Sequence, residues 1–221
     1  MSARREDLAV SLRRDWEPRL REFASAQPGA DPAHGAVHLE RVVATAMKLA
    51  AEEGARLEIV LPAAWLHDCV HIAKDSPDRP RASQLAAEHA ARFLEAAGYP
   101  AACLPEIRHA IEAHSFSAGI APRTVEAKVV QDADRLDALG AVGLARCIAV
   151  GAALDRPLYE RDDPFCRSRM PDDRGASLDH FYAKLLKLAG TMQTRAGRRE
   201  AERRTDFLRA FIAQLETEIG A

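Results

Sequence analysis

Residues 63–75, AAWLHDCVHIAKD, begin as an apolar run and then place His67 and Asp68 side by side. The apolar residues before the pair recur at helical spacing, which predicts a buried helix with the pair near its C-terminal end. Burying an imidazole beside a carboxylate costs free energy unless both groups find partners. A divalent cation resting against the helix would pair with both groups, because nitrogen and oxygen donors suit the same metals. The alternative is a buried, hydrogen-bonded pair without a metal.

A second segment, DPAHGAVHLERVV (31–43), contributes more histidines. His34 and His38 lie four residues apart on one face of a predicted helix, and Arg41 follows within one turn. Two histidines at this spacing reach one ion or one ligand. Arg41 would then bind an anion held at that place. The alternative is a solvated polar face, although such faces are usually built from Lys and Glu.

A third segment, VVQDADRLDALGAVGLAR, sets acids into an otherwise apolar helical pattern. Its three aspartates are Asp132, Asp134 and Asp137. The second and third share one flank of the predicted helix and the first lies on the opposite flank, so periodicity leaves open which one is a ligand. The competing interpretation is that they form surface salt bridges with Arg135 or Arg146.

The composition is that of an ordinary globular protein. The 221 residues carry a formal net charge of −2, with 48% hydrophobic and 29% charged residues. This balance gives no general attraction to nucleic acid or to an anionic membrane. The N-terminus does not resemble a secretory signal, and no apolar run reaches the ~20 residues of a spanning helix. Four separated cysteines, without a CxxC pair, indicate reduced and mostly buried thiols. We therefore expect a cytoplasmic protein that binds neither membranes nor nucleic acid.

Residue usage and spacing predict an all-α fold. Ala, Leu, Glu and Arg dominate, and apolar residues recur three and four positions apart. We expect helices at about 4–25, 33–53, 57–70, 82–97, 101–115, 122–153, 176–195 and 198–219. Gly54 and the GYP triplet at 98–100 mark helix ends. The stretch at 155–175, rich in proline and arginine, predicts a linker, a lid or a surface loop. The chain is expected to form a single domain.

The segments HGAVHLERV, LHDCVH and DADRLDALGA, in this order, resemble the signature segments of the HD-domain superfamily of metal-dependent phosphohydrolases. The resemblance implies an HD-domain-like helical bundle over residues 1–221. Its metal core would lie at about 31–146, and helices at 176–219 would contribute to the substrate pocket. It also implies four ligands to one divalent ion: His38, His67, Asp68 and Asp134. Asp132 is the alternative to the last of these. Mn²⁺ or Mg²⁺ is the expected ion, with Fe²⁺, Co²⁺ or Ni²⁺ as alternatives.

More closely, the chain resembles small stand-alone bacterial HD phosphohydrolases, some of which act on nucleotides. We therefore expect a metal-activated water to cleave a phosphate or pyrophosphate ester of a nucleotide or another small phosphorylated metabolite. Asp68 and His67 would be the catalytic residues. The substrate-binding candidates are Arg41, His34, Lys74, His114, Lys184 and Lys187. The two last lysines form a helical stripe with His180, whereas His114 either contacts the substrate or caps local backbone.

Further histidines bear on the number of metals. The candidates for a second ion are His89, His109 and His114, but the last two are five residues apart, about 140° around a helix. One metal is therefore expected. Two alternatives stay open: an iron-dependent HD-type oxygenase, whose sites are normally dinuclear, and a non-catalytic, metal-stabilised ligand-binding module. The expected partner is a small phosphorylated substrate such as a nucleotide, and a homodimer stays open.

Overall fold

The structure, a computed structural model, describes residues 3–27, 35–72, 76, 78–115 and 118–220. Within these ranges every regular element is helical and there is no strand, which confirms the all-α prediction. The α-helices are α1 (Ala3–Ser25), α2 (Ala36–Glu53), α3 (Leu57–Leu66), α4 (Ala82–Ala96), α5 (Leu104–His114), α6 (Val125–Leu136), α7 (Gly140–Ala153), α8 (Asp179–Ala183) and α9 (Arg195–Ile219). Three 3₁₀-helices accompany them: η1 (Arg79–Arg81), η2 (Ala101–Cys103) and η3 (Leu185–Thr191).

The chain divides into two compact units, residues 1–134 and residues 135–221, and each is described by itself. That both belong to one HD-type domain stays a prediction. The same holds for the proposal that helices at 176–219 contribute to a substrate pocket.

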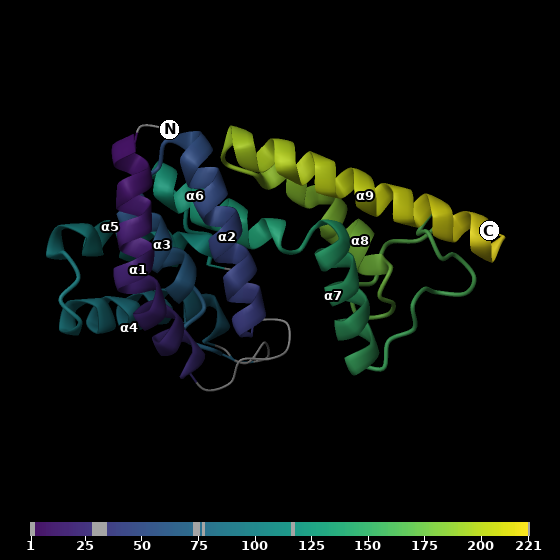
Figure 1. The fold of residues 1–221 in the computed structure, drawn as a ribbon. Coiled ribbons are helices and arrows are strands. Elements are labelled where there is room, and N and C mark those ends of the chain that lie inside the picture. Colours follow the sequence, from purple (N-terminus) through teal and green to yellow (C-terminus); the bar gives the residue numbers. More distant parts are fainter. Residues whose placement is uncertain (1–2, 28–34, 73–75, 77, 116–117, 221) are drawn as a thin grey trace. The chain divides into compact units, whose positions relative to one another are not determined.

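Helix α3 is the centre of the first unit (Figure 1). It contacts α1, α2 and α5. Its ten residues, LEIVLPAAWL, are almost all apolar, and nine of them are buried. A helix that is hydrophobic all round is stable only when other helices cover every face. The end of this helix is therefore enclosed, and that is where His67 follows.

Glycines end two helices of the first unit as the sequence predicts. Gly54 follows α2 in the left-handed conformation (φ 75°), and its N–H donates to the carbonyl of Ala50. Gly98 follows α4 with φ 80°. The neighbouring Tyr99 is buried, and its hydroxyl donates to the carbonyl of Glu58 at 2.6 Å. The GYP triplet thus stops a helix and anchors it to α3.

The second unit is held together by buried polar contacts as well as apolar ones. Asp179 is fully buried and accepts hydrogen bonds from the guanidinium of Arg169, including one from Nη2 at 2.7 Å. Asp163 accepts hydrogen bonds from the backbone N–H groups of Arg167 and Ser168, which form a turn within the stretch at 155–175. Helices α7 and η3 contact α9.

Three predicted helices differ from the observed ones. The helix expected at 57–70 ends at Leu66, because His67 already caps it. The helix expected at 122–153 is two helices, because Leu139 is extended (φ −117°, ψ 163°) and Gly140, the first residue of α7, is left-handed (φ 70°). The helix expected at 176–195 breaks at Lys184, which leaves the α-helical region (φ −134°) before η3 begins. The continuous α-helical stripe joining His180, Lys184 and Lys187 is therefore wrong.

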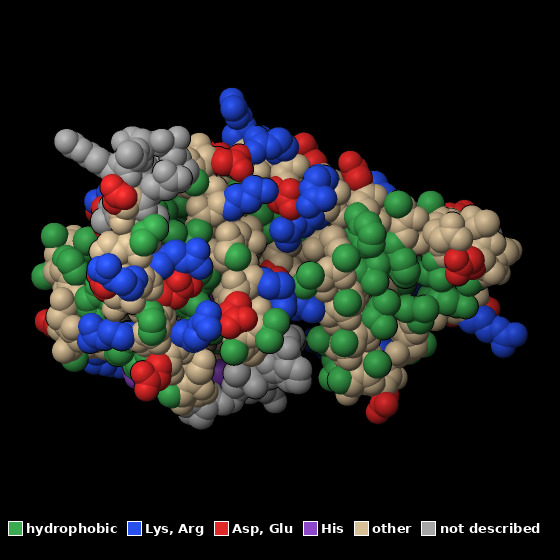
Figure 2. Space-filling view, viewed as in Figure 1, with side chains coloured by type: hydrophobic (Ala, Val, Ile, Leu, Met, Phe, Trp, Pro, Cys, Tyr) green, Lys and Arg blue, Asp and Glu red, His purple; other side chains and the backbone are tan. Residues whose placement is uncertain are grey.

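No single helix in the described part of the chain is long and apolar enough to cross a membrane. The consecutive helices α6 and α7 reach the required length and composition only as a bent pair. On the face shown in Figure 2, Lys and Arg side chains are interspersed with Asp and Glu. The four cysteines are free thiols; Cys69 alone is fully buried, so the expectation of mostly buried thiols is wrong.

Candidate metal centre

His67 is fixed by its own helix. Its ring is fully buried, and Nδ1 donates a hydrogen bond to the carbonyl of Ala64 at 2.8 Å. A proton on Nδ1 leaves the lone pair on Nε2, the arrangement found in metal-ligating histidines. Nε2 is buried and has no hydrogen-bond partner among the described residues. Burial lowers the pKa of His67 in spite of the nearby acids, so the imidazole is neutral, the form that binds a cation.

Two carboxylates face this nitrogen. Asp68 Oδ2 lies 3.6 Å and Asp134 Oδ1 lies 3.7 Å from Nε2 of His67. His38, buried on α2, places its Nε2 3.5 Å from the same Oδ1 of Asp134. These separations are long for hydrogen bonds. They match donor atoms that each lie ~2.0–2.2 Å from one shared ion.

The four side chains thus converge from α2, the end of α3 and α6. The ligand atoms form two overlapping groups, one of His38, His67 and Asp134 and the other of His67, Asp68 and His114. Within each group the atoms lie within 4.8 Å of one another, and His67 is common to both. All of these residues belong to the first unit. A buried nitrogen with a free lone pair, facing two carboxylates, fits a divalent ion. The residues present could therefore hold the predicted metal.

Helix α6 is held in register by two contacts. Glu126 accepts a hydrogen bond from the backbone N–H of Arg56 at 3.1 Å. Gln131 donates to the carbonyl of Ala113 on α5 at 2.6 Å. Asp134 follows Gln131 by one turn, so these contacts aim its carboxylate at the histidines. Asp132 is fully buried and belongs to neither group of ligand atoms found among the described residues.

His114 caps local backbone, one of the two roles that the sequence left open, and it also contacts Asp68; its contact with substrate stays a prediction. Its Nδ1 donates to the carbonyl of Ile111 at 2.6 Å, which is the local cap. Its Nε2 lies 3.4 Å from Asp68 Oδ1, and its ring packs edge-on against His67 with 4.8 Å between the centroids. Burial lowers the pKa of His114, but the hydrogen bond and the charge of Asp68 outweigh this and raise it.

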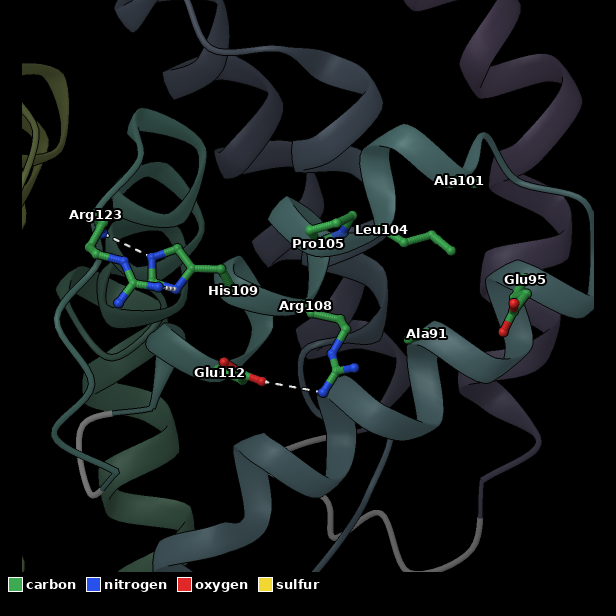
Figure 3. Close-up of a pocket in the computed structure, with 9 residues that line it drawn as sticks. All are labelled: Ala91, Glu95, Ala101, Leu104, Pro105, Arg108, His109, Glu112 and Arg123. Atoms are coloured by element: carbon green, nitrogen blue, oxygen red, sulfur yellow. Dashed lines mark hydrogen bonds and ion pairs between the residues drawn. The ribbon is translucent and has the colours of Figure 1, made fainter.

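The other two histidine candidates point elsewhere. His89 Nε2 lies 3.1 Å from Gln27. His109 accepts a hydrogen bond from the backbone N–H of Arg123 at 2.9 Å and lines a groove of about 480 Å³ beside α4 and α5. Figure 3 shows this groove, in which Arg108 also reaches toward Glu112 (3.9 Å). The predicted divergence of His109 and His114 around one helix is confirmed, since only His114 faces the metal cluster.

The remaining predicted residues have different outcomes. Arg41 is half-buried on α2, three residues after His38. His34 and Lys74 lie outside the described residues. Lys184 and Lys187 belong to the second unit. The roles of all five in substrate binding stay predictions.

Sequence reasoning missed residues of a small cavity beside the cluster. The cavity has a volume of about 40 Å³. It is lined by Asp68, Val70, His71, Arg79, Ala82, Ser83, His114 and Ser115. The signal was available: Arg79 and Ser83 lie four residues apart where η1 leads into α4, a spacing that aligns side chains when the chain is helical. The alternative interpretation, in which the three aspartates form surface salt bridges with Arg135 or Arg146, is met in part: Asp137 pairs with Arg146, but its carboxylate is buried.

Comparison with known proteins gives consistent results. The model of the HD domain matches residues 35–139. The uncharacterized protein YpgQ of Bacillus subtilis (strain 168) is 34% identical over 186 residues, which are 82% of this chain and 82% of YpgQ.

Solved structures resemble the chain along most of its length. The crystal structure of Bacillus subtilis YpgQ in complex with ADP matches with a TM-score of 0.70 at 32% identity, covering 91% of this chain and 97% of YpgQ. The crystal structure of an HD-superfamily hydrolase from Bacillus thuringiensis matches with a TM-score of 0.71 at 32% identity, covering 95% and 99% of the two chains.

Proposed function

The chain belongs to the HD-domain superfamily, and we propose that it is a metal-dependent phosphohydrolase. Its substrate is a nucleotide or another small phosphorylated metabolite, in which it cleaves a phosphate or pyrophosphate ester. The observation that carries the proposal is the buried Nε2 of His67, which faces Asp68 and Asp134 at 3.6 and 3.7 Å without a hydrogen bond. A purely structural role would leave this nitrogen without a hydrogen bond, whereas a metal ion would bind its lone pair.

The ligands that we assign are His38, His67, Asp68 and Asp134. When bound there, a divalent ion acidifies a water molecule and offsets negative charge on the transferred phosphoryl group. Asp68, whose side chain is 30% exposed, accepts the proton of that water. His114 holds the other oxygen of this carboxylate through Nε2 and so fixes its direction. Arg41 is the first candidate to bind a substrate anion.

The histidine shared by the two groups of ligand atoms supports a single ion. Both groups of ligand atoms include His67, and its Nδ1 is already engaged with a backbone carbonyl. The single remaining nitrogen binds one ion at a time, so the two groups cannot each hold a separate ion through His67. This supports the mononuclear prediction. It also weighs against the oxygenase alternative, because that chemistry normally uses two metals.

A nucleotide substrate is supported by one relative. The YpgQ protein of Bacillus subtilis, similar along most of its length, was crystallised in complex with ADP. A nucleotide offers phosphate oxygens to the metal and to cationic side chains, which is the chemistry that this site supplies.

The test is a screen of the full-length protein against nucleoside mono-, di- and triphosphates and sugar phosphates, with Mn²⁺, Mg²⁺, Co²⁺ or Ni²⁺. Phosphate and pyrophosphate are read separately. We expect metal-dependent release that Asp68→Ala lowers by about 10³-fold, because it removes a ligand and the proton acceptor. His89→Ala, on α4 and bonded to Gln27, is the matched control and keeps its activity. Full turnover by the Asp68 variant would end the assignment.

A further inference from the structure

The small cavity beside the metal cluster contains a hydroxyl group without a partner. Ser83 is 2% exposed, and its Oγ has no hydrogen-bond partner among the described residues. Leaving a buried hydroxyl unsatisfied costs free energy, so such groups normally meet a ligand or a water. Ser83 lies in the first turn of α4 and lines the cavity together with Asp68 and His114. The hydroxyl therefore indicates a polar occupant.

A guanidinium lines the same cavity. Arg79, in η1, donates from Nη1 to the carbonyl of Ile72 at 2.7 Å, which fixes the side chain but uses one of its five N–H groups. Among the described residues no carboxylate lies within ion-pair distance of Arg79. The nearby Arg81 differs, because it lies 3.7 Å from Asp78 and does not line the cavity. Arg79 thus keeps its positive charge for a ligand.

These groups define the chemistry of the occupant. Arg79 and Ser83 are hydrogen-bond donors, and one of them is a cation, so the matching ligand is an oxyanion. The cavity volume of about 40 Å³ exceeds the ~10–15 Å³ that one water requires, which leaves room for a small group of heavy atoms. Asp68, which also lines the cavity, would repel an anion unless a cation neutralises it. Binding of the oxyanion and of the metal should therefore favour each other.

We propose that Ser83 and Arg79 bind one phosphoryl group of the substrate, next to the metal ligand Asp68. The inference rests on the proposed function, since it places part of a phosphorylated substrate in the same site. The proposal adds Ser83 and Arg79 as residues that contact the substrate directly, and it keeps the same four metal ligands.

The test uses inorganic phosphate as the probe and the full chain with Mg²⁺. Isothermal titration calorimetry should show that Mg²⁺ strengthens phosphate binding by about tenfold, a typical coupling between neighbouring sites. Ser83→Ala and Arg79→Gln should each weaken phosphate binding about tenfold or more, because each removes a hydrogen bond to a charged group. Mg²⁺ affinity without phosphate should stay within about twofold of the wild type, since neither residue is a ligand.

The matched control is Arg81→Gln, two residues away on the same turn. It removes an equal charge outside the cavity and should leave phosphate affinity unchanged. Ser83→Ala should melt at or above the wild-type temperature, because it removes an unsatisfied hydroxyl. Equal phosphate binding by wild type, Ser83→Ala and Arg79→Gln would overturn the proposal. So would an Arg81 variant that weakens binding as much as the Arg79 variant.

The two proposals fail in different ways. If the protein binds phosphate through Ser83 and Arg79 but hydrolyses no phosphate ester, the proposed function is wrong and the binding site stands. If it hydrolyses a nucleotide while the two variants keep the wild-type KM and phosphate affinity, the function stands and the binding site is wrong. With both correct, the variants raise KM about tenfold.

Discussion

Replacing His67 by leucine separates the metal-binding role of this residue from its role in folding. Leucine is of similar size and apolar, so it fills the same buried space at the end of α3. It removes Nε2, the proposed ligand atom, and Nδ1, which donates to the carbonyl of Ala64 at 2.8 Å. The free energy of unfolding measured without metal therefore reports on the role of His67 in folding. The change on adding metal reports on its role in metal binding.

Without metal, the His67→Leu change removes one favourable and one unfavourable contribution to the free energy of unfolding, and the two are of similar size. The wild type carries a buried Nε2 without a hydrogen bond, which costs about 1–3 kcal/mol. Leucine removes that cost but also removes the bond to Ala64, worth about 1 kcal/mol. We expect the metal-free variant to unfold within about 2 kcal/mol of the metal-free wild type. With metal at 100 times its Kd, the wild type gains about 2.7 kcal/mol and the variant gains nothing.

The assay is urea unfolding of the full-length protein, followed by far-UV circular dichroism, in EDTA and in Mn²⁺. His89→Leu serves as the control, because it removes a histidine from α4 outside the cluster and should keep the metal-dependent gain. The reasoning is refuted if the His67 variant gains as much stability from Mn²⁺ as the wild type. A loss above about 4 kcal/mol in EDTA would instead show that the imidazole is needed for folding.

Three further predictions concern the second unit. Asp179→Asn should lower the free energy of unfolding by about 2–3 kcal/mol, less than a fully buried pair because the Arg169 side chain is 26% exposed. Burial raises the pKa of Asp179, but the hydrogen bonds from Arg169 outweigh the effect of burial and lower this pKa below its unfolded value of about 3.9. The Asp179–Arg169 pair therefore stabilises the fold above that value, and the stabilisation is lost as the pH falls through the folded pKa. Urea titrations of wild type and variant from pH 7 to 3 would detect this loss. Thr194→Ala should cost about 1 kcal/mol by thermal unfolding, since its hydroxyl accepts from Gly197 N–H at the start of α9 (2.9 Å); an unchanged melting temperature would contradict the cap. Gly140→Ala should cost about 1–2 kcal/mol in urea, because φ of 70° strains any residue with a Cβ, and a more stable variant would contradict that conformation.

Local sequence was sufficient where neighbouring residues alone set the structure. The apolar run before His67 predicted a buried helix, and every apolar residue of α3 is buried. Gly54 and Gly98 predicted two helix ends, because left-handed backbone is easy only for glycine. The His-Asp pair and the flanking motifs also predicted the family, which the HD-domain match confirms.

Helical periodicity failed to predict the helix ends where the apolar spacing continues but the backbone leaves the helical conformation. Apolar spacing runs through residues 136–140 without interruption, and the helix still ends at Leu136 and restarts at Gly140 after the extended Leu139. Around Lys184 the pattern is helical, but the chain leaves the α-helical region there. Periodicity records which residues face a core and does not record where the backbone has to turn to reach it.

The sequence by itself determined the all-α class, the superfamily and the residue types that could bind a divalent ion. Only the tertiary structure brought Asp134, and not Asp132, to the buried nitrogen of His67, and only it added His114 to the cluster. The cavity of Ser83 and Arg79 also emerged at that level. The physical reason is that a ligand set spans about 4 Å in space but almost a hundred residues of chain, from His38 to Asp134. Helical periodicity fixes directions around one axis, and the packing of α2, α3, α5 and α6 decides where those directions meet.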